Sequence, residues 1–164
     1  ASEPPMRIRL PAESLTMTIN ATFDAPVERV WQVWNDPRQL ERWWGPPTYP
    51  ATVVDHDFSP GGTVTYYMTG PEGDRPHGWW RVVAVDAPHH LQFEDGFADG
   101  DGRPDPSLPT TNCTVHLAPR DGGGTDMQVV TTFASLKAME QLVTMGMEEG
   151  IRQALGQIDA ILAG

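Results

Sequence analysis

The C-terminal part of the chain carries one apolar stripe with the spacing of a helix. Apolar or small residues recur every three or four positions from residue 136 to residue 161, and charged residues fall on the opposite side. Side chains three and four positions apart share one helix face, so this spacing predicts one long amphipathic helix. The predicted stripe consists of Leu136, Met139, Val143, Met147, Gly150, Ala154, Ile158 and Ile161.

The preceding part of the chain alternates apolar and polar residues in short segments, separated by turns rich in glycine and proline. Such segments are typical of antiparallel strands, in which successive side chains point to opposite faces of a sheet. The seven predicted strands cover residues 15–23, 51–58, 63–69, 78–85, 90–95, 112–117 and 125–133.

Two short helices are predicted between the first and second strands. Pro26 and Pro37 each suit the first position of a helix, where no backbone hydrogen bond is lost. The second helix should run to about Trp44, because a glycine and two prolines follow. Leu40, Trp43 and Trp44 share one face of it. We expect this face to pack as a plug against the sheet and the long helix, with Trp44 at the mouth of a cavity as the alternative.

These elements together predict the fold class. An amphipathic helix must bury its apolar stripe, and a sheet must bury one of its faces. A curved antiparallel sheet of about seven strands wrapped around the long helix satisfies both requirements. We therefore predict an α+β fold of the helix-grip type, with a single domain over residues 14–164 and a flexible N-terminal tail over residues 1–13.

Composition and charge narrow the range of partners. Eleven basic and 22 acidic residues give a net charge of −11, which disfavours binding to nucleic acid and to anionic membrane surfaces. No apolar run approaches the ~18 residues that a membrane-spanning helix needs, so we expect no membrane insertion. Cys113 is the only cysteine, which rules out an intramolecular disulfide and fits a cytoplasmic location.

No residue pattern predicts a metal or a cofactor, and we expect neither. The histidines near the predicted strand ends lack the spacing of zinc ligands. An acidic segment lacks the spacing of a calcium loop because Arg103 occupies a ligand position, and we expect a solvated loop there. The acidic residues in question are Asp95, Asp99, Asp101 and Asp105.

Glycines within the predicted long helix raise the question of a cavity. Gly150 lies in the apolar stripe and Gly146 at its edge, and glycine in a helix costs ~1 kcal/mol relative to alanine. Close approach of the sheet is the commoner reason for such glycines. The alternative is that space is left beside the helix for a ligand, with Met139 and Met147 flanking the gap.

The alternation within each strand indicates which side chains face the helix. Asp55 and Asp57 mark the solvent side of the second predicted strand, so Val54, His56 and Phe58 on its other side should face inward. The same argument applied to the other strands, together with the stripe of the long helix and the alternative for Trp44, completes the set of cavity candidates. They are Trp44, Val54, His56, Phe58, Val64, Tyr66, Met68, Val129, Met139, Val143, Gly146, Met147 and Gly150.

His56 and Tyr66 would then be polar groups in an apolar cup, which is the usual composition of a small-molecule site. A histidine can act as acid or base near neutral pH, and Glu140 at the edge of the helix stripe is a candidate partner for it. The catalytic candidates are therefore His56, Tyr66 and Glu140. The alternative for His56 is a buried histidine satisfied by a neighbour. The sequence contains no phosphate-binding loop or nucleophile elbow.

Several runs of the sequence together resemble a known superfamily. They are APVERVWQVWNDPRQLERWWGPP, DHDFSPGG, PHGWWRVVAVDAPHHLQFED and GMEEGIRQALGQIDAIL. These runs resemble the SRPBCC (START-like, helix-grip) superfamily, and within it the branch related to the activator of the heat-shock protein 90 ATPase. The resemblance extends over about residues 15–163. It implies a curved sheet that grips the C-terminal helix, with a cavity between them.

The resemblance leaves several functions open. Members of the superfamily bind lipids, sterols or polyketides, some act as cyclases, and related domains act on a chaperone. Ile151 stands where many relatives carry a bulky aromatic residue, which separates this chain from their ligand preferences. Fold alone does not decide function.

We expect a cytoplasmic protein that binds a small apolar or aromatic ligand between sheet and helix. A regulator of the heat-shock protein 90 ATPase, suggested by resemblance only, is one alternative. A cyclase- or hydrolase-type enzyme that uses His56 with Tyr66 or Glu140 is the other. Homodimer formation through exposed sheet or tryptophan surfaces is left open by the composition.

Overall fold

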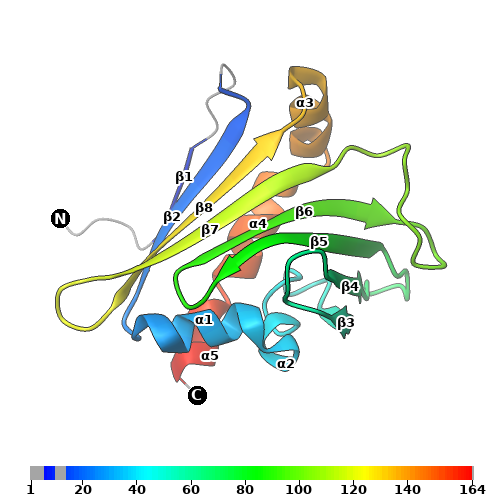
Figure 1. The fold of residues 1–164 in the computed structure, drawn as a ribbon. Coiled ribbons are helices and arrows are strands. Elements are labelled where there is room, and N and C mark those ends of the chain that lie inside the picture. Colours follow the sequence, from blue (N-terminus) through cyan, green and yellow to red (C-terminus); the bar gives the residue numbers. More distant parts are fainter. Residues whose placement is uncertain (1–5, 10–13, 164) are drawn as a thin grey trace.

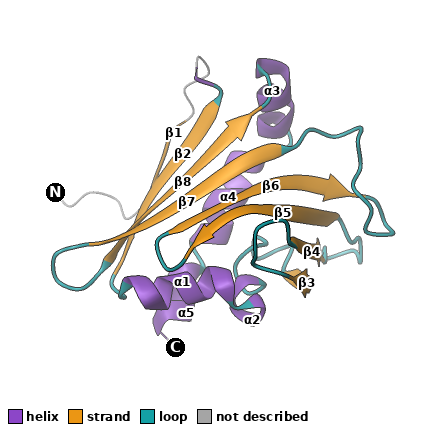
Figure 2. Cartoon of the chain, in the orientation of Figure 1, coloured by secondary structure: helices purple, strands orange, loops and turns teal. Residues whose placement is uncertain are grey.

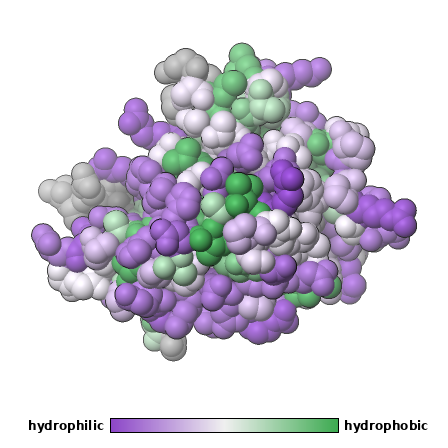
Figure 3. Space-filling model, viewed as in Figure 1, coloured by the Kyte–Doolittle hydropathy of each residue, from purple (hydrophilic) through white to green (hydrophobic). Residues whose placement is uncertain are grey.

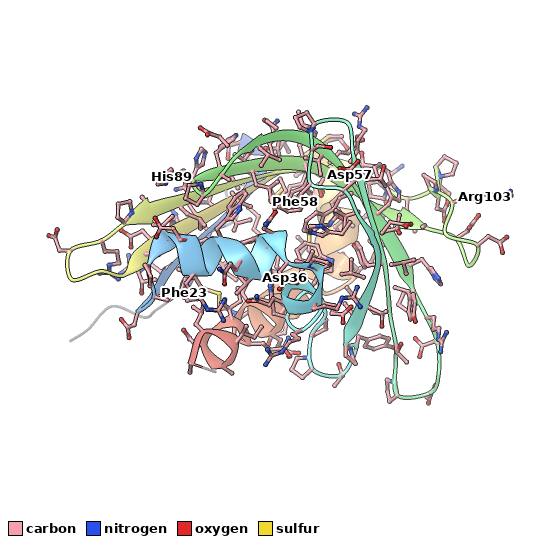
Figure 4. The ribbon with its side chains drawn as sticks, turned by 60° about the horizontal axis from the view of Figure 1, so that its bottom comes forward. Phe23, Asp36, Asp57, Phe58, His89 and Arg103 are labelled. Atoms are coloured by element: carbon pink, nitrogen blue, oxygen red, sulfur yellow. The ribbon has the colours of Figure 1, made fainter. Side chains whose placement is uncertain are left out.

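The computed structural model describes residues 6–9 and 14–163. Among these residues, eight strands form one antiparallel sheet in the order β1-β2-β8-β7-β6-β5-β4-β3 (Figure 1). The sheet arches over α1, and the C-terminal helices lie beneath the same arch (Figure 4). The α+β class and the helix-grip arrangement are confirmed. No helix of the described residues has both the length and the apolar character needed to cross a membrane.

The elements follow one another as two N-terminal strands, two short helices, six strands and three helical segments (Figure 2). The strands are β1 Met6–Arg9, β2 Thr16–Phe23, β3 Ala51–His56, β4 Thr63–Met68, β5 His77–Asp86, β6 His90–Ala98, β7 Thr111–Pro119 and β8 Thr125–Phe133. The helices are α1 Val27–Asn35, α2 Pro37–Leu40, α3 Leu136–Thr144, α4 Met147–Leu155 and α5 Ile158–Ala163.

Strand β1 lies inside the segment that the sequence predicted as a flexible tail. It pairs antiparallel with β2, with Met6 opposite Ala21 and Ile8 opposite Ile19. Met6 and Ile8 are partly buried against the core, so this edge strand covers the end of the sheet. The sheet therefore has eight strands rather than about seven. The rest of the predicted tail, residues 1–5 and 10–13, lies outside the described residues.

The C-terminal segment is helical as predicted, but it is divided into three helices instead of one. Gly146 separates α3 from α4 with a φ of 89°, a left-handed conformation that interrupts a right-handed helix and that glycine adopts without strain. A second turn separates α4 from α5, where the Gln157 N–H donates to the Ala154 carbonyl at 3.1 Å. Neither break could be predicted from the stripe, because the apolar residues keep the spacing of a helix across both turns.

The buried face of α3 differs from the face that the predicted stripe occupies. Met139 and Leu142 face the core, whereas Val143 is 38% exposed and Leu136 is 48% exposed. The predicted stripe is therefore wrong on α3 at these last two positions. It is correct further along, where Ile158 is fully buried in α5. Figure 3 shows apolar surface at the top of the molecule, where α3 lies.

The second short helix ends earlier than predicted. Regular helix stops at Leu40, and Trp43 and Trp44 follow in turns whose backbone N–H groups both donate to the Leu40 carbonyl. Asp36 caps this helix by accepting from the Arg38 N–H at 2.9 Å, at the corner between α1 and α2 shown in Figure 4. The helical turn therefore continues far enough to place both tryptophans beneath the sheet.

Trp43 forms the centre of the plug expected from this segment. Its side chain is fully buried, and its Nε1 donates to the Val33 carbonyl at 2.8 Å. Its ring packs edge to face against Trp34 at a centroid distance of 4.6 Å. Gln157 ties the segment to the C-terminal helices, because its amide donates to the Gly45 carbonyl at 2.7 Å. The plug thus fixes one end of the sheet to the helical segment.

Candidate functional site

A pocket lies where the concave face of the sheet meets the junction of α3 and α4. Its volume is about 270 Å³, slightly below the ~300–1,000 Å³ typical of ligand sites. Among the described residues that line it, Tyr66 and Asp95 are the only ionisable ones. The lining residues are Trp44, Pro46, Tyr66, Met68, Asp95, Gly96, Phe97, Pro109, Thr111, Leu142, Met145, Gly146, Met147, Gly150 and Ile151.

Gly150 explains why the pocket is open on the helix side. A Cβ placed on this glycine would meet no atom within 4 Å, so the sheet does not approach α4 closely at this point. Of the two explanations offered for the helix glycines, open space is the one that applies to Gly150. The explanation for Gly146 is different: its positive φ is needed for the break between α3 and α4.

Trp44 forms part of the pocket wall. Its ring packs edge to face against Tyr66 at a centroid distance of 5.9 Å and against Trp80 at 4.7 Å. The side chain is half-buried, and its Nε1 has no hydrogen-bond partner of acceptable geometry within the described residues. The two neighbouring tryptophans therefore play different parts: Trp43 lies in the core, and Trp44 borders the pocket.

Tyr66 and Asp95 form the polar part of the pocket. Tyr66 is on β4, and its hydroxyl donates to Asp95 Oδ1 on β6 at 3.2 Å. The tyrosine reaches β6 by crossing β5 at Gly78, where an added Cβ would collide with the Tyr66 ring and hydroxyl. Glycine at this position of β5 thus allows the two functional groups to meet.

The surroundings of this pair shift both protonation equilibria. Burial raises the pKa of Asp95 to about 7, and the hydrogen bonds from Tyr66 and from the Gly96 backbone oppose the rise. Burial, with the nearby Asp95, raises the pKa of Tyr66 well above its usual value, and the Trp44 indole partly offsets this. The carboxyl lies deep among protein atoms, although Asp95 keeps some surface open to the pocket.

Asp95 is a pocket residue whose surroundings were predicted wrongly from the sequence. It was expected to end the strand 90–95 and to begin a solvated acidic segment, but β6 continues to Ala98 and carries Asp95 on its concave face. Leu91 and Phe93 are fully buried on that face. Continuing their alternation by one further residue would have identified Asp95 as an inward position. The remainder of the acidic segment does follow the prediction, since Asp99 is exposed and Arg103 lies out on the loop (Figure 4).

The structure separates the three catalytic candidates. His56 stacks on Phe58 with a ring-centroid distance of 4.5 Å, and its Nε2 lies 3.4 Å from the Trp34 carbonyl oxygen. Neither His56 nor Phe58 lines the pocket. Glu140 is exposed on α3, and among the described residues it forms no hydrogen bond or ion pair with His56. Of the three candidates, Tyr66 alone reaches the pocket.

A bulge in β3 overturns the prediction for Val54. The pairing of β3 with β4 shifts register between Val53 and Asp55, which places two residues opposite one. Val53 therefore faces the core with 3% of its surface exposed, and Val54 points outward with 61% exposed. Strict alternation from the sequence cannot reveal such a bulge.

The other predicted cavity residues fall into three groups. Val143 is a further correction, because the buried face of α3 is formed by Ala138, Met139 and Leu142 and leaves Val143 exposed. Val64, Val129 and Met139 are buried in the core without lining the pocket. The predicted residues that do line it are Trp44, Tyr66, Met68, Gly146, Met147 and Gly150.

Within residues 6–9 and 14–163, no group of three or more His, Cys, Asp or Glu side chains is placed to hold a metal ion. Cys113 is buried, and burial with the nearby Asp95 raises the pKa of its thiol to about 12. The thiol is therefore not a nucleophile at neutral pH. The chemistry available in the pocket is that of one carboxyl, one hydroxyl and apolar walls.

Comparisons with known proteins agree with this geometry. The family model described as "Activator of Hsp90 ATPase homolog 1-like protein" matches residues 24–163. The solution structure of a protein from Arthrobacter aurescens is 50% identical, with a TM-score of 0.92, over 96% of this chain and 91% of that chain. The crystal structure of protein Ms6760 from Mycobacterium smegmatis is 50% identical, with a TM-score of 0.87, over 95% of each chain.

More distant structures have the same architecture. A protein from Rhodobacter sphaeroides is 25% identical, with a TM-score of 0.81, over 96% of this chain and 98% of that chain. No curated protein matches this chain. The family match covers most of the chain and includes every element from α1 to α5. The chain therefore belongs to the family of Activator of Hsp90 ATPase homolog 1-like proteins, within the SRPBCC superfamily.

Proposed function

We propose that this protein binds a small, mostly apolar molecule in the pocket between the sheet and the α3–α4 junction. The observation that carries the proposal is an apolar pocket of about 270 Å³ with one polar pair, Tyr66 and Asp95, in its wall. Apolar walls with a few placed polar groups are the usual composition of a small-molecule site. We place this binding in the cytoplasm, which the single, buried and unpaired Cys113 supports.

The walls and the polar pair have separate parts in the proposed binding. Trp44 and Phe97 supply flat apolar surface, and Met68 and Met147 supply flexible thioether side chains that adapt to irregular shapes. The polar pair, at the sheet side, would orient the ligand. Gly150 leaves room for it on the helix side, since nothing lies within 4 Å of its missing Cβ.

The proposal is tested by titrating the protein with N-phenylnaphthylamine, an uncharged probe that fluoresces in apolar surroundings. We expect saturable binding with one site in the wild-type chain. Gly150→Leu should weaken probe binding at least tenfold, because the new side chain occupies the pocket. It should retain or raise the melting temperature, since leucine is the better helix former.

Ala160→Leu is the matched control, because it adds the same side chain to an exposed position of α5. This variant should bind the probe as the wild type does. Absence of saturable binding in the wild type would contradict the proposal, and so would undiminished binding in a folded Gly150→Leu variant.

The two alternative functions remain predictions. Regulation of a chaperone ATPase is suggested by the family, whose description names an activator of Hsp90 ATPase. Catalysis by His56 with Tyr66 or Glu140 has no support in the geometry. His56 packs on Phe58 outside the pocket that Tyr66 lines, and Glu140 is exposed on α3. The pocket favours small-molecule binding over these two alternatives.

A further inference from the structure

We infer that the preferred ligands are lipophilic amines, bound with the ammonium group at Asp95 and the apolar body against the aromatic and thioether walls. This inference rests on the proposed function, because it names the chemical class that the same pocket would take. Neither the family description nor the relatives' names specify a ligand class.

The first argument is the charge balance within the pocket. No Lys, Arg or His side chain is among the described residues that line it. Tyr66 is the only side chain of the described residues that hydrogen-bonds Asp95, and it contacts Oδ1 alone. The titratable groups that face Asp95 are Tyr66 from β4 and Cys113 from β7, and neither supplies a positive charge. A charged partner stabilises the ionised form of a buried carboxyl, and a ligand ammonium would provide one.

The second argument is the nature of the walls next to the carboxyl. The rings of Trp44 and Tyr66 stand edge to face at 5.9 Å beside the pocket, and Phe97 lies on the same strand as Asp95. Aromatic faces attract cations, more strongly where water is excluded. The methylene or aromatic body of an amine would find apolar contact with Met68 and Leu142, which also line the pocket.

The third argument is the exclusion of other ligand classes. A ligand carboxylate would meet Asp95 as a like charge in surroundings with little solvent to screen it. A neutral alcohol would gain a hydrogen bond but no charge pairing, and charge-assisted hydrogen bonds are the stronger kind. The net charge of −11 further favours cations over anions near the molecule.

A series with one carbon skeleton separates these classes: naphthylmethylamine, naphthylmethanol and naphthoic acid. Each compound is titrated at pH 8 as a competitor of N-phenylnaphthylamine. We expect the amine to bind at least tenfold more tightly than the alcohol, and the acid to bind most weakly. The amine should also bind about tenfold more weakly at pH 6 than at pH 8, because Asp95 with a pKa of about 7 becomes protonated.

Asp95→Asn should abolish both the preference for the amine over the alcohol and its pH dependence. Glu94→Gln is the matched control, because it removes one negative charge from the adjacent position, on the other face of β6. This variant should keep both properties. Circular dichroism and thermal unfolding verify that each variant is folded. If Asp95→Asn does not fold, the affinities of the three compounds for the wild type and the pH dependence of amine binding still test the inference.

The outcomes distinguish the inference from the proposed function. If the probe binds but the alcohol or the acid equals or exceeds the amine, the amine inference is overturned and pocket binding stands. If neither the probe nor any of the three compounds binds, the proposed function itself fails. Retained amine preference in a folded Asp95→Asn variant would show that another group selects the ligand, which also overturns the inference.

Discussion

At the scale of single residues, the most consequential contact is that between Tyr66 and Asp95. Two ordinary features of a sheet create it: a glycine at position 78, which lets a tyrosine cross the intervening strand, and the concave orientation of Asp95 on β6. The same burial that orders the carboxyl opposes its charge. The stability of the protein should therefore respond to the protonation of this one group.

Asp95→Asn should change how the free energy of unfolding depends on pH. The folded-state pKa of Asp95, about 7, exceeds its usual value of 3.8, so the folded state holds the proton more tightly than the unfolded state. The stability contributed by this group is complete below about pH 4 and is lost as the pH rises to 7. We expect the variant to be more stable than the wild type at pH 8, by on the order of a few kcal/mol at most.

Urea denaturation at pH 5 and pH 8 measures this effect. The wild type should lose more stability between the two pH values than Asp95→Asn does, and Glu94→Gln should follow the wild type. Parallel pH dependence in the wild type and Asp95→Asn would contradict a raised folded-state pKa for the carboxyl.

At the scale of elements, the C-terminal helices show that two glycines in one apparent stripe have different physical roles. Gly146 adopts a φ of 89° and ends one helix, whereas Gly150 lies within α4 beside open space. Only the backbone conformation distinguishes them. Their substitution by the same residue should therefore have effects of opposite sign on stability.

Gly150→Ala should stabilise the fold by about 0.5–1 kcal/mol, because alanine is the better helix former and its Cβ meets no atom. Gly146→Ala should destabilise it by about 1 kcal/mol or more, because a Cβ is strained at positive φ. Chemical denaturation of both variants under one set of conditions tests the pair. The same sign for both changes would be incompatible with the break at Gly146.

The element scale also shows what sequence patterns can and cannot reveal. Alternation correctly oriented Tyr66, because β4 is regular, but failed at Val54, because a bulge in β3 changes the count of residues per pair. Helical spacing correctly identified Ile158 as buried but wrongly placed Val143 on the buried face. Asp95 was misplaced because its acidic neighbours outweighed the alternation of β6. Periodic patterns predict regular strands and helices, whereas the shape of the pocket also depends on irregular features such as the break between α3 and α4.

At the scale of the whole molecule, the segment around the paired tryptophans joins the fold to the pocket. Trp43 is fully buried under the sheet, while the adjacent Trp44 borders the pocket. Gln157 attaches this segment to the turn between α4 and α5. One short stretch therefore contributes to both stability and proposed binding, through different residues.

Truncation of each tryptophan should separate the two contributions. Trp43→Ala should lose about 3–5 kcal/mol of unfolding free energy, as expected when a large buried side chain is removed. Trp44→Ala should lose less stability and weaken binding of N-phenylnaphthylamine at least tenfold. Denaturation and probe titration of both variants provide the measurement. A Trp44→Ala variant that loses as much stability as Trp43→Ala and still binds the probe would contradict this division.

Gly150 has a consequence for how this pocket can change over generations. Alanine or leucine at this position would improve the helix and reduce the room beside it. Higher stability and a larger bound molecule are therefore competing requirements at this one residue, if the proposed binding is retained by selection. A lineage that no longer needs its ligand would gain by drifting to alanine or leucine here. A lineage that binds a bulkier ligand should retain glycine at this position. This position is therefore an informative one to compare when relatives with different ligands are sought.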